Sequence, residues 1–116
     1  MNYFDLSDAE LLSRLKQDDR IAFETIYRHY ASDLFKYLSG KVETKDDCEE
    51  ILIDVFITLW MDRYSISNDL NEYLSTSIKH RLILYVRDNP QSPLFTHLKQ
   101  SFYETREEKK VSEEEG

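Results

Sequence analysis

The sequence predicts an all-α fold, a compact bundle of four main helices, on three observations. Apolar residues recur every three or four positions through most of the 116-residue chain, which is the spacing of amphipathic helices. Only two glycines and two prolines interrupt it, whereas a β-sandwich or barrel needs many tight turns. Hydrophobic residues make up 41% of the chain and aromatic residues 13%, which is enough for one core.

The first two helices are expected over 7–17 and 19–39. Ser7 and Glu10 form a capping box at the start of the first, and Asp18-Asp19 ends it and caps the second. The second helix has one apolar face at helical spacing. Its members are Phe23, Ile26, Tyr27, Tyr30, Leu34, Phe35 and Leu38.

The third and fourth helices are expected over 44–62 and 68–88. Thr44 can cap the third helix, whose first turns are rich in acids that the helix dipole favours. Its predicted core face is Cys48, Ile51, Leu52, Val55, Phe56, Leu59 and Trp60. Ser67 or Asn68 can cap the fourth helix. Its predicted buried side is Leu70, Leu74, Ile78, Leu82 and Tyr85, which leaves Glu72, Thr76, Lys79, Ile83 and Arg87 exposed.

One domain is expected over 1–88, because Pro90 disfavours a helical conformation at the residue before it. Residues 89–104 are expected to form a linker, in which Ser92 and Pro93 can start a fifth helix over 93–104. The charged segment 105–116 is expected to be an acidic, disordered tail.

The composition argues against several classes of function. Cys48 is the single cysteine, so no internal disulfide can form, and a reducing cytoplasmic location is expected. The three histidines do not have metal-ligand spacing, and no cofactor is expected. No apolar run approaches the roughly 18 residues that span a membrane. Because no nucleophile, base and orienting group are arranged together, we do not expect an enzyme.

Three blocks of sequence resemble a known family in the same order. The first comprises Asp8-Ala9-Glu10-Leu11-Leu12 and Ala22-Phe23-Glu24-Thr25-Ile26-Tyr27-Arg28-His29-Tyr30, the second is the third helix from Asp47 to Trp60, and the third runs from Tyr73 to Arg87. From Asp8 to Arg87 the chain resembles region 2 of extracytoplasmic-function sigma factors, the small sigma-70 proteins that direct bacterial RNA polymerase to promoters. The resemblance covers about two thirds of the chain.

The resemblance implies two surfaces. In the family, the third helix docks on the clamp helices of the largest polymerase subunit, and the following loop and fourth helix capture unpaired bases of the −10 promoter element. The polymerase-binding residues expected here are Glu50, Ile53, Asp54 and Ile57. The DNA-binding residues expected here are Tyr64, Ser65, Asn68, Tyr73, Thr76, Lys79, His80, Arg81 and Arg87.

The physical chemistry of these residues suits both roles. Ile53 and Ile57 widen the apolar surface of the third helix beyond one core face, and Glu50 and Asp54 border it with charge, which suits a partner helix with arginines. Cations can follow phosphates while planar or polar groups hold extruded bases. Alternatives remain for two sets of residues: Ile53 and Ile57 can instead contact the fifth helix, and Tyr64 can simply close the loop over the core.

The charge supports a second hypothesis. The net charge is −8, whereas domains that bind duplex DNA are usually basic. The chain also departs from the family by having Ile53, His80, Leu84 and Asp88 where polar or basic residues are common. The alternative is therefore a sigma-like interaction module without DNA binding, which binds an anti-sigma factor or a second copy of itself.

Overall fold

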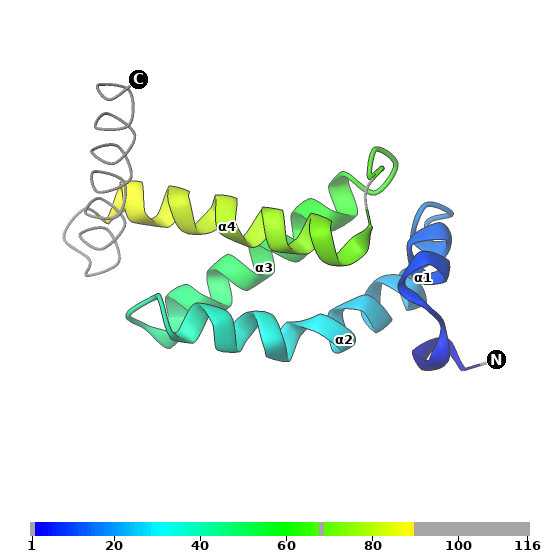
Figure 1. Cartoon of the computed structure of the whole chain (residues 1–116), viewed down its shortest axis with the longest axis horizontal. Helices are drawn as coiled ribbons and strands as arrows, with labels where there is room; N and C mark the ends of the chain where they lie inside the picture. The colour runs from blue at the N-terminus through cyan, green and yellow to red at the C-terminus, as the bar shows by residue number, and fades with distance from the viewer. Residues whose placement is uncertain (1, 68, 90–116) are drawn as a thin grey trace, which may run out of the picture. The chain divides into compact units, whose positions relative to one another are not determined.

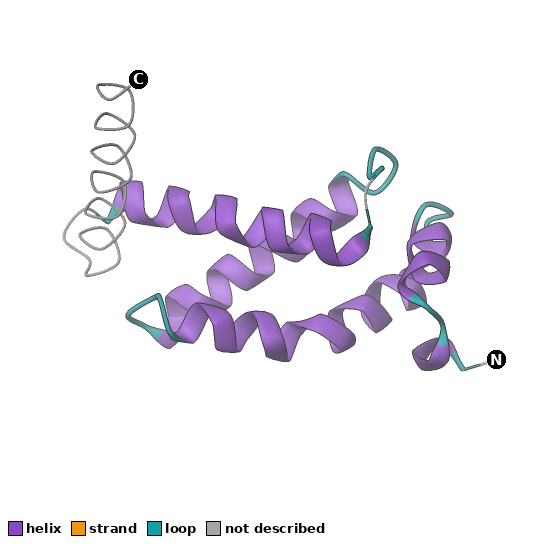
Figure 2. Ribbon diagram, viewed as in Figure 1, coloured by secondary structure: helices purple, strands orange, loops and turns teal. Residues whose placement is uncertain are grey.

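The computed structural model describes residues 2–67 and 69–89. Within these residues every regular element is a helix (Figure 2). A short 3₁₀ helix, η1 (Tyr3–Asp5), precedes α1 (Asp8–Leu15), α2 (Arg20–Ser39), α3 (Lys45–Met61) and α4 (Leu70–Asp88). The prediction of an all-α fold with four main helices is confirmed. The predicted fifth helix and acidic tail lie outside the described residues.

Side-chain caps set the starts of the first three helices. Glu10 donates its backbone N–H to Ser7 Oγ at 3.2 Å, and Ile21 donates to Asp19 Oδ1 at 2.9 Å. Asp47 donates its backbone N–H to Thr44 Oγ1 at 3.1 Å. Each bond satisfies a backbone donor that has no partner inside its own helix, as the sequence predicts for these capping residues.

The predicted cap of α4 was wrong. Glu72 donates its backbone N–H to Asp69 Oδ1 at 2.7 Å, so Asp69 caps this helix in place of Ser67 or Asn68. Asn68 itself lies outside the described residues. Serine, asparagine and aspartate are all good caps and follow one another here, so local rules cannot rank them. A negative carboxylate also suits the positive end of the helix dipole.

The turn after α1 begins earlier than predicted. The helix ends at Leu15, and the backbone N–H groups of Gln17 and Asp18 donate to carbonyl oxygens three residues back. Asp18 has a φ of 63°, the left-handed conformation that aspartate adopts more readily than most residues. This tight turn ends the helix and leads directly into the Asp19 cap.

The chain separates into one unit over residues 1–82 and a second over 83–116, with the division inside α4. In the second unit the structure describes the end of α4 and Asn89. There, the Asn89 side-chain amide donates to the Tyr85 carbonyl oxygen at 2.9 Å. The last turn is therefore capped just before Pro90, where helix termination was expected.

In the first unit, α3 packs on α2 through an apolar face. Figure 1 shows these two helices as neighbours, joined by the short loop after α2. The buried side chains of α3 are Cys48, Ile51, Leu52, Val55, Phe56 and Leu59. These match the predicted core face except Trp60, which is only half-buried because its ring lies at the rim next to Arg63.

The other helices and the loop before α4 complete this core. The predicted buried side of α4 within this unit is confirmed at Leu70, Leu74, Ile78 and Leu82. Ile66, in the loop between α3 and α4, is also buried at 3% exposure, and its carbonyl oxygen accepts a bond from Lys16 Nζ at 2.7 Å. The loop is therefore fixed against the end of α1.

The predicted apolar face of α2 is only partly buried. Ile26 and Leu38 have no exposed surface, but Tyr27 is 43% exposed. The Tyr27 ring contacts Phe56 edge-on at 4.9 Å between centroids, while the rest of the ring faces solvent. Periodicity identified an apolar face here, but an amphipathic tyrosine can lie at the edge of a core.

Leu59→Ala is expected to destabilise the protein much more than Ile57→Ala. Leu59 is fully buried, so its truncation should lower the free energy of unfolding by about 2–5 kcal/mol through lost burial and a residual cavity. Ile57, two residues earlier in the same helix, is 51% exposed, so its truncation should cost less than about 1 kcal/mol. Urea unfolding of both variants measures the difference, and equal losses would contradict the two-faced arrangement of α3.

Candidate functional site

The outward face of α3 presents an apolar strip. We use "α3 strip" for Ile53, Ile57 and Met61, which follow one another at intervals of four residues. Their side chains are 55%, 51% and 73% exposed. Ile53 and Ile57 are therefore not buried within the first unit. Met61 is not among the residues expected from the sequence, although it follows Ile57 at the same interval of four residues.

Two surface hollows lie between the α3 strip and α2. Arg20, Phe23 and Glu24 of α2 line the first hollow together with Ile57 and Trp60 of α3. The second hollow is lined by residues of both helices. These are Tyr27, Ala31, Ser32, Phe35 and Lys36 of α2, and Glu49, Leu52 and Ile53 of α3. The candidate partner surface is therefore built by two helices, whereas the sequence analysis assigned it to one.

Aromatic contacts fix the floor between these helices. Phe23 contacts Phe56 and Trp60 edge-on, with ring centroids 6.4 Å and 5.5 Å apart. Tyr27 contacts the other side of the same cluster through Phe56. Edge-to-face packing of this kind adds stabilisation beyond burial and limits ring motion. The aromatic residues that line the hollows, Phe23, Tyr27 and Trp60, are therefore held in place by ring contacts.

Charged residues border the α3 strip. Glu50 is exposed and Asp54 is half-buried, on the helix face next to Ile53 and Ile57. The α2 side is mixed, because Arg20 lies with Glu24 in the first hollow. An apolar strip with an acidic border favours a partner that combines apolar side chains with cations.

The predicted DNA-binding residues of α4 fall into two groups. Thr76, Lys79 and His80 are exposed on the helix. Arg87 is also exposed, near the end of α4 in the second unit. These residues are accessible to a ligand, and their DNA role stays a prediction.

Tyr73 and Arg81 instead connect α4 to α3. The Tyr73 hydroxyl donates to Asp62 Oδ2 at 3.0 Å and lies 3.4 Å from the Thr58 carbonyl oxygen. Arg81 Nη2 donates to Thr58 Oγ1 at 2.7 Å. Both side chains are half-buried, so each has a structural role at the end of α3.

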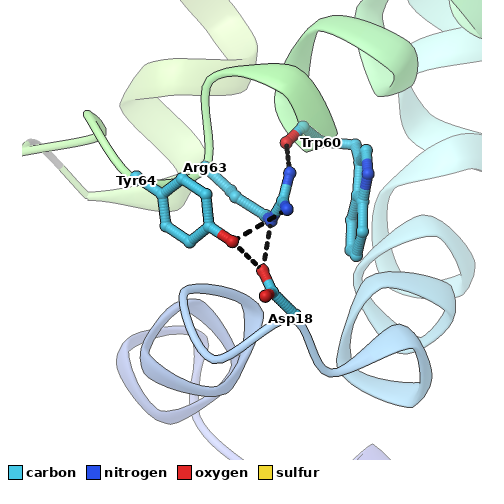
Figure 3. A network of polar contacts seen from close by, with 4 residues as sticks. All are labelled: Asp18, Trp60, Arg63 and Tyr64. Carbon is cyan, nitrogen blue, oxygen red and sulfur yellow. Dashed lines mark hydrogen bonds and ion pairs between the residues drawn. The ribbon is translucent and has the colours of Figure 1, made fainter.

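The loop after α3 contains a polar network that the sequence analysis did not predict. We use "loop network" for Asp18, Trp60, Arg63 and Tyr64, which Figure 3 shows together. Arg63 Nε donates to Asp18 Oδ1 at 2.8 Å, and Arg63 Nη1 donates to the Trp60 carbonyl oxygen at 2.6 Å. Arg63 Nη2 donates to the Tyr64 hydroxyl at 2.9 Å, and that hydroxyl donates to Asp18.

Two aromatic rings also hold the Arg63 guanidinium. Its central carbon lies 4.0 Å from the centroid of the Trp60 ring and 4.3 Å from that of Tyr64. Both distances are within the range of cation–π attraction. Tyr64 remains 60% exposed, so it closes the loop against Asp18 and Arg63 and not over the core.

The network also shifts proton affinities. Hydrogen bonds from Tyr64 and Arg63 hold the pKa of Asp18 below its ordinary value, because they stabilise the carboxylate. The hydrogen bond to Asp18 raises the pKa of Tyr64, because its proton is needed for that bond. Asp18 is therefore an anion, and Tyr64 a neutral donor, across the physiological pH range.

The remaining predicted residues of the loop contribute little to this network. Ser65 is exposed, and its hydroxyl donates to the Asp62 carbonyl oxygen at 2.9 Å. Asn68 lies outside the described residues. The sequence contained one signal for the network, the cation and tyrosine side by side at 63–64, but nothing linked them to an aspartate 45 residues earlier.

Other features of the described part of the chain define no further chemical centre. Residues 2–67 and 69–89 contain no group of three or more His, Cys, Asp or Glu side chains placed to hold a metal ion. In the same residues no helix is long and apolar enough to cross a membrane. Cys48 is buried as predicted, and burial raises the pKa of its thiol.

Comparisons of the chain with protein-family profiles, with curated proteins and with solved structures found no match.

The Tyr73 contact predicts a loss of stability at alkaline pH. Burial first, and then the bond to Asp62, raises the pKa of Tyr73 above its ordinary value near 10. Because Tyr73 has a higher pKa in the folded protein than in the unfolded chain, its protonated form stabilises the fold. This stabilisation is fully present below the pKa of the unfolded chain and is lost as the pH rises through the folded pKa. The free energy of unfolding should thus fall as the pH rises above the ordinary tyrosine pKa of about 10.

Tyr73→Phe tests this assignment. The variant should lose about 0.5–1.5 kcal/mol of unfolding free energy at neutral pH, and its alkaline decline should be shallower than that of the wild type. Urea unfolding at several pH values measures both effects. An equally steep decline in the variant would assign the alkaline loss to other tyrosines, such as Tyr30, whose pKa burial and Asp8 also raise.

Proposed function

We propose that this chain acts as a sigma-factor region 2 domain, which binds the clamp helices of bacterial RNA polymerase and helps to recognise and melt the −10 promoter element. The observation that supports this proposal most directly is the exposed α3 strip with its acidic border. A helix that only packs one face against a core needs no apolar residues on its exposed side. Ile53 and Ile57 lie on that side, and both are more than half exposed. The sequence resemblance assigns the same helix face to polymerase.

The docking contact on this proposal involves α2 as well as α3. Apolar side chains of the clamp helices enter the two hollows, and their cations approach Glu50 and Asp54. Phe23 and Trp60 form walls that are already packed in the free protein. Preorganised walls reduce the entropy cost of association.

The DNA contact involves the exposed side of α4 and the loop before it. Lys79 supplies a cation for the phosphate backbone, and His80 and Thr76 supply polar groups beside it. Because the net charge is −8, the affinity of the free protein for DNA is low, and the polymerase supplies most of the attraction. Cytoplasmic location is part of the same proposal.

Glu50→Lys and Asp54→Lys should each weaken binding to the isolated clamp fragment. Each change reverses a charge at the border of the α3 strip, so we expect a loss of about three- to tenfold in affinity. Asp33→Lys is the matched control, because Asp33 is an exposed acid of α2 that lines neither hollow. Binding by calorimetry or pull-down checks this, and equal affinity of all three variants would reject the surface.

Lys79→Glu should abolish promoter opening while leaving binding to the clamp fragment intact. The change places a negative charge where a phosphate is expected, and Lys79 lies on a different helix from the α3 strip. Lys41→Glu, an exposed lysine between α2 and α3, is the control. Opening is measured by permanganate reactivity of unpaired thymines with polymerase core. Normal opening by Lys79→Glu would remove the DNA role of α4.

A second candidate function has support from the charge. A net charge of −8, and the internal bonds of Tyr73 and Arg81, favour a sigma-like module that binds an anti-sigma factor or a second copy of itself. A gel shift with single-stranded −10-like DNA separates the two candidates. Binding only with polymerase core supports the sigma function, and no binding with or without core supports the module.

A further inference from the structure

The Arg63 guanidinium is held as a planar, oriented anion-binding group. Two neutral acceptors, the Trp60 carbonyl oxygen and the Tyr64 hydroxyl, bind its Nη atoms at 2.6 Å and 2.9 Å. The guanidinium lies between the Trp60 and Tyr64 rings, as Figure 3 shows, and contacts both. Its Nε faces the one charged partner in this network, Asp18 Oδ1 at 2.8 Å.

Asp18 is an accessible and exchangeable partner. Its side chain is 56% exposed, whereas that of Arg63 is 15% exposed. Because solvent reaches the Asp18 side of the ion pair, screening limits what the pair contributes to stability. A phosphate oxygen has the same charge and acceptor geometry as the carboxylate oxygen, and arginine binds both well.

We infer that the loop network is a site for a backbone phosphate of single-stranded nucleic acid, and that Asp18 is the internal carboxylate that fills it in the free protein. The phosphate replaces Asp18 at Arg63 Nε. The inference rests on the proposed function, because it explains how the loop after α3 binds an unpaired strand. It adds Asp18, Trp60 and Arg63, none of which is among the DNA-binding residues expected from the sequence.

The neighbouring rings favour a single strand over a duplex. When Asp18 leaves, the Tyr64 hydroxyl loses its acceptor, and the exposed part of its ring, which is not in contact with Arg63, can stack on an unpaired base next to the bound phosphate. Stacking on an aromatic ring is available to any base, but only when the base is unpaired. The site therefore binds a phosphate and an adjacent base together.

The same arrangement suppresses binding in the free protein. The Asp18 carboxylate neutralises Arg63 and repels an approaching phosphate, in a chain whose net charge is already −8. The φ of 63° at Asp18 restricts the position to residues that tolerate this conformation, and asparagine is the closest uncharged replacement. Asp18→Asn therefore removes the competing charge and keeps the backbone and the size of the side chain.

The test is the affinity of the full chain for fluorescein-labelled oligodeoxythymidylate at low salt, measured by anisotropy. Asp18→Asn should bind about two- to fivefold more tightly than the wild type, which is the range that an exposed ion pair supports. Asp33→Asn, which makes the same charge change at an exposed site on α2, should change affinity by less than about twofold. The double variant Asp18→Asn with Arg63→Gln should lose the gain.

A second readout comes from the single tryptophan of the chain. Because Arg63 contacts the Trp60 ring, oligonucleotide binding should change Trp60 emission in the wild type and not in Arg63→Gln. Equal oligonucleotide affinities of Asp18→Asn and Asp33→Asn would overturn the inference. The proposed function would still stand in that case if Lys79→Glu weakens oligonucleotide binding. No binding by any variant, with or without polymerase core, would overturn both.

Discussion

The burial of one side of α3 is the constraint on which the other features depend. Val55 and Leu59 have no exposed surface, and α3 packs against α2. Residues two positions apart on a helix point in different directions, so this burial leaves Ile53 and Ile57 facing solvent. The same packing places α2 beside the α3 strip and creates the two hollows. The candidate partner surface is thus a consequence of the core.

Trp60 connects the two candidate surfaces. One side of its ring lines the hollow with Phe23 and Ile57, and the ring also contacts the Arg63 guanidinium at 4.0 Å. A partner that enters this hollow therefore touches a residue that holds the loop network. Docking at α3 and strand binding at the loop therefore share the Trp60 side chain on this proposal.

Local charge matters more here than the net value. The chain is strongly acidic, yet its cations are placed differently: Lys79 is exposed, while Arg63 and Arg81 are bonded to neighbours. Exposed charges separated by more than about 10 Å are largely screened at physiological salt. The availability of each cation therefore depends on its nearest partners, and for Arg63 that partner is a carboxylate that an outside anion can replace.

The sequence by itself determined the helices, their caps and most of the core, because periodicity and capping depend on residues within about one helical turn of each other. It determined most of the core face of α3, but it left open whether Ile53 and Ile57 face solvent or contact the predicted fifth helix. It did not determine which of three adjacent residues caps α4, or that Tyr27 lies at the edge of the core. Only the tertiary structure decided that Asp18 meets Arg63 and Tyr64 and that α2 lines the hollows. Those contacts join residues tens of positions apart, and their geometry follows from how whole helices pack, which no local pattern specifies.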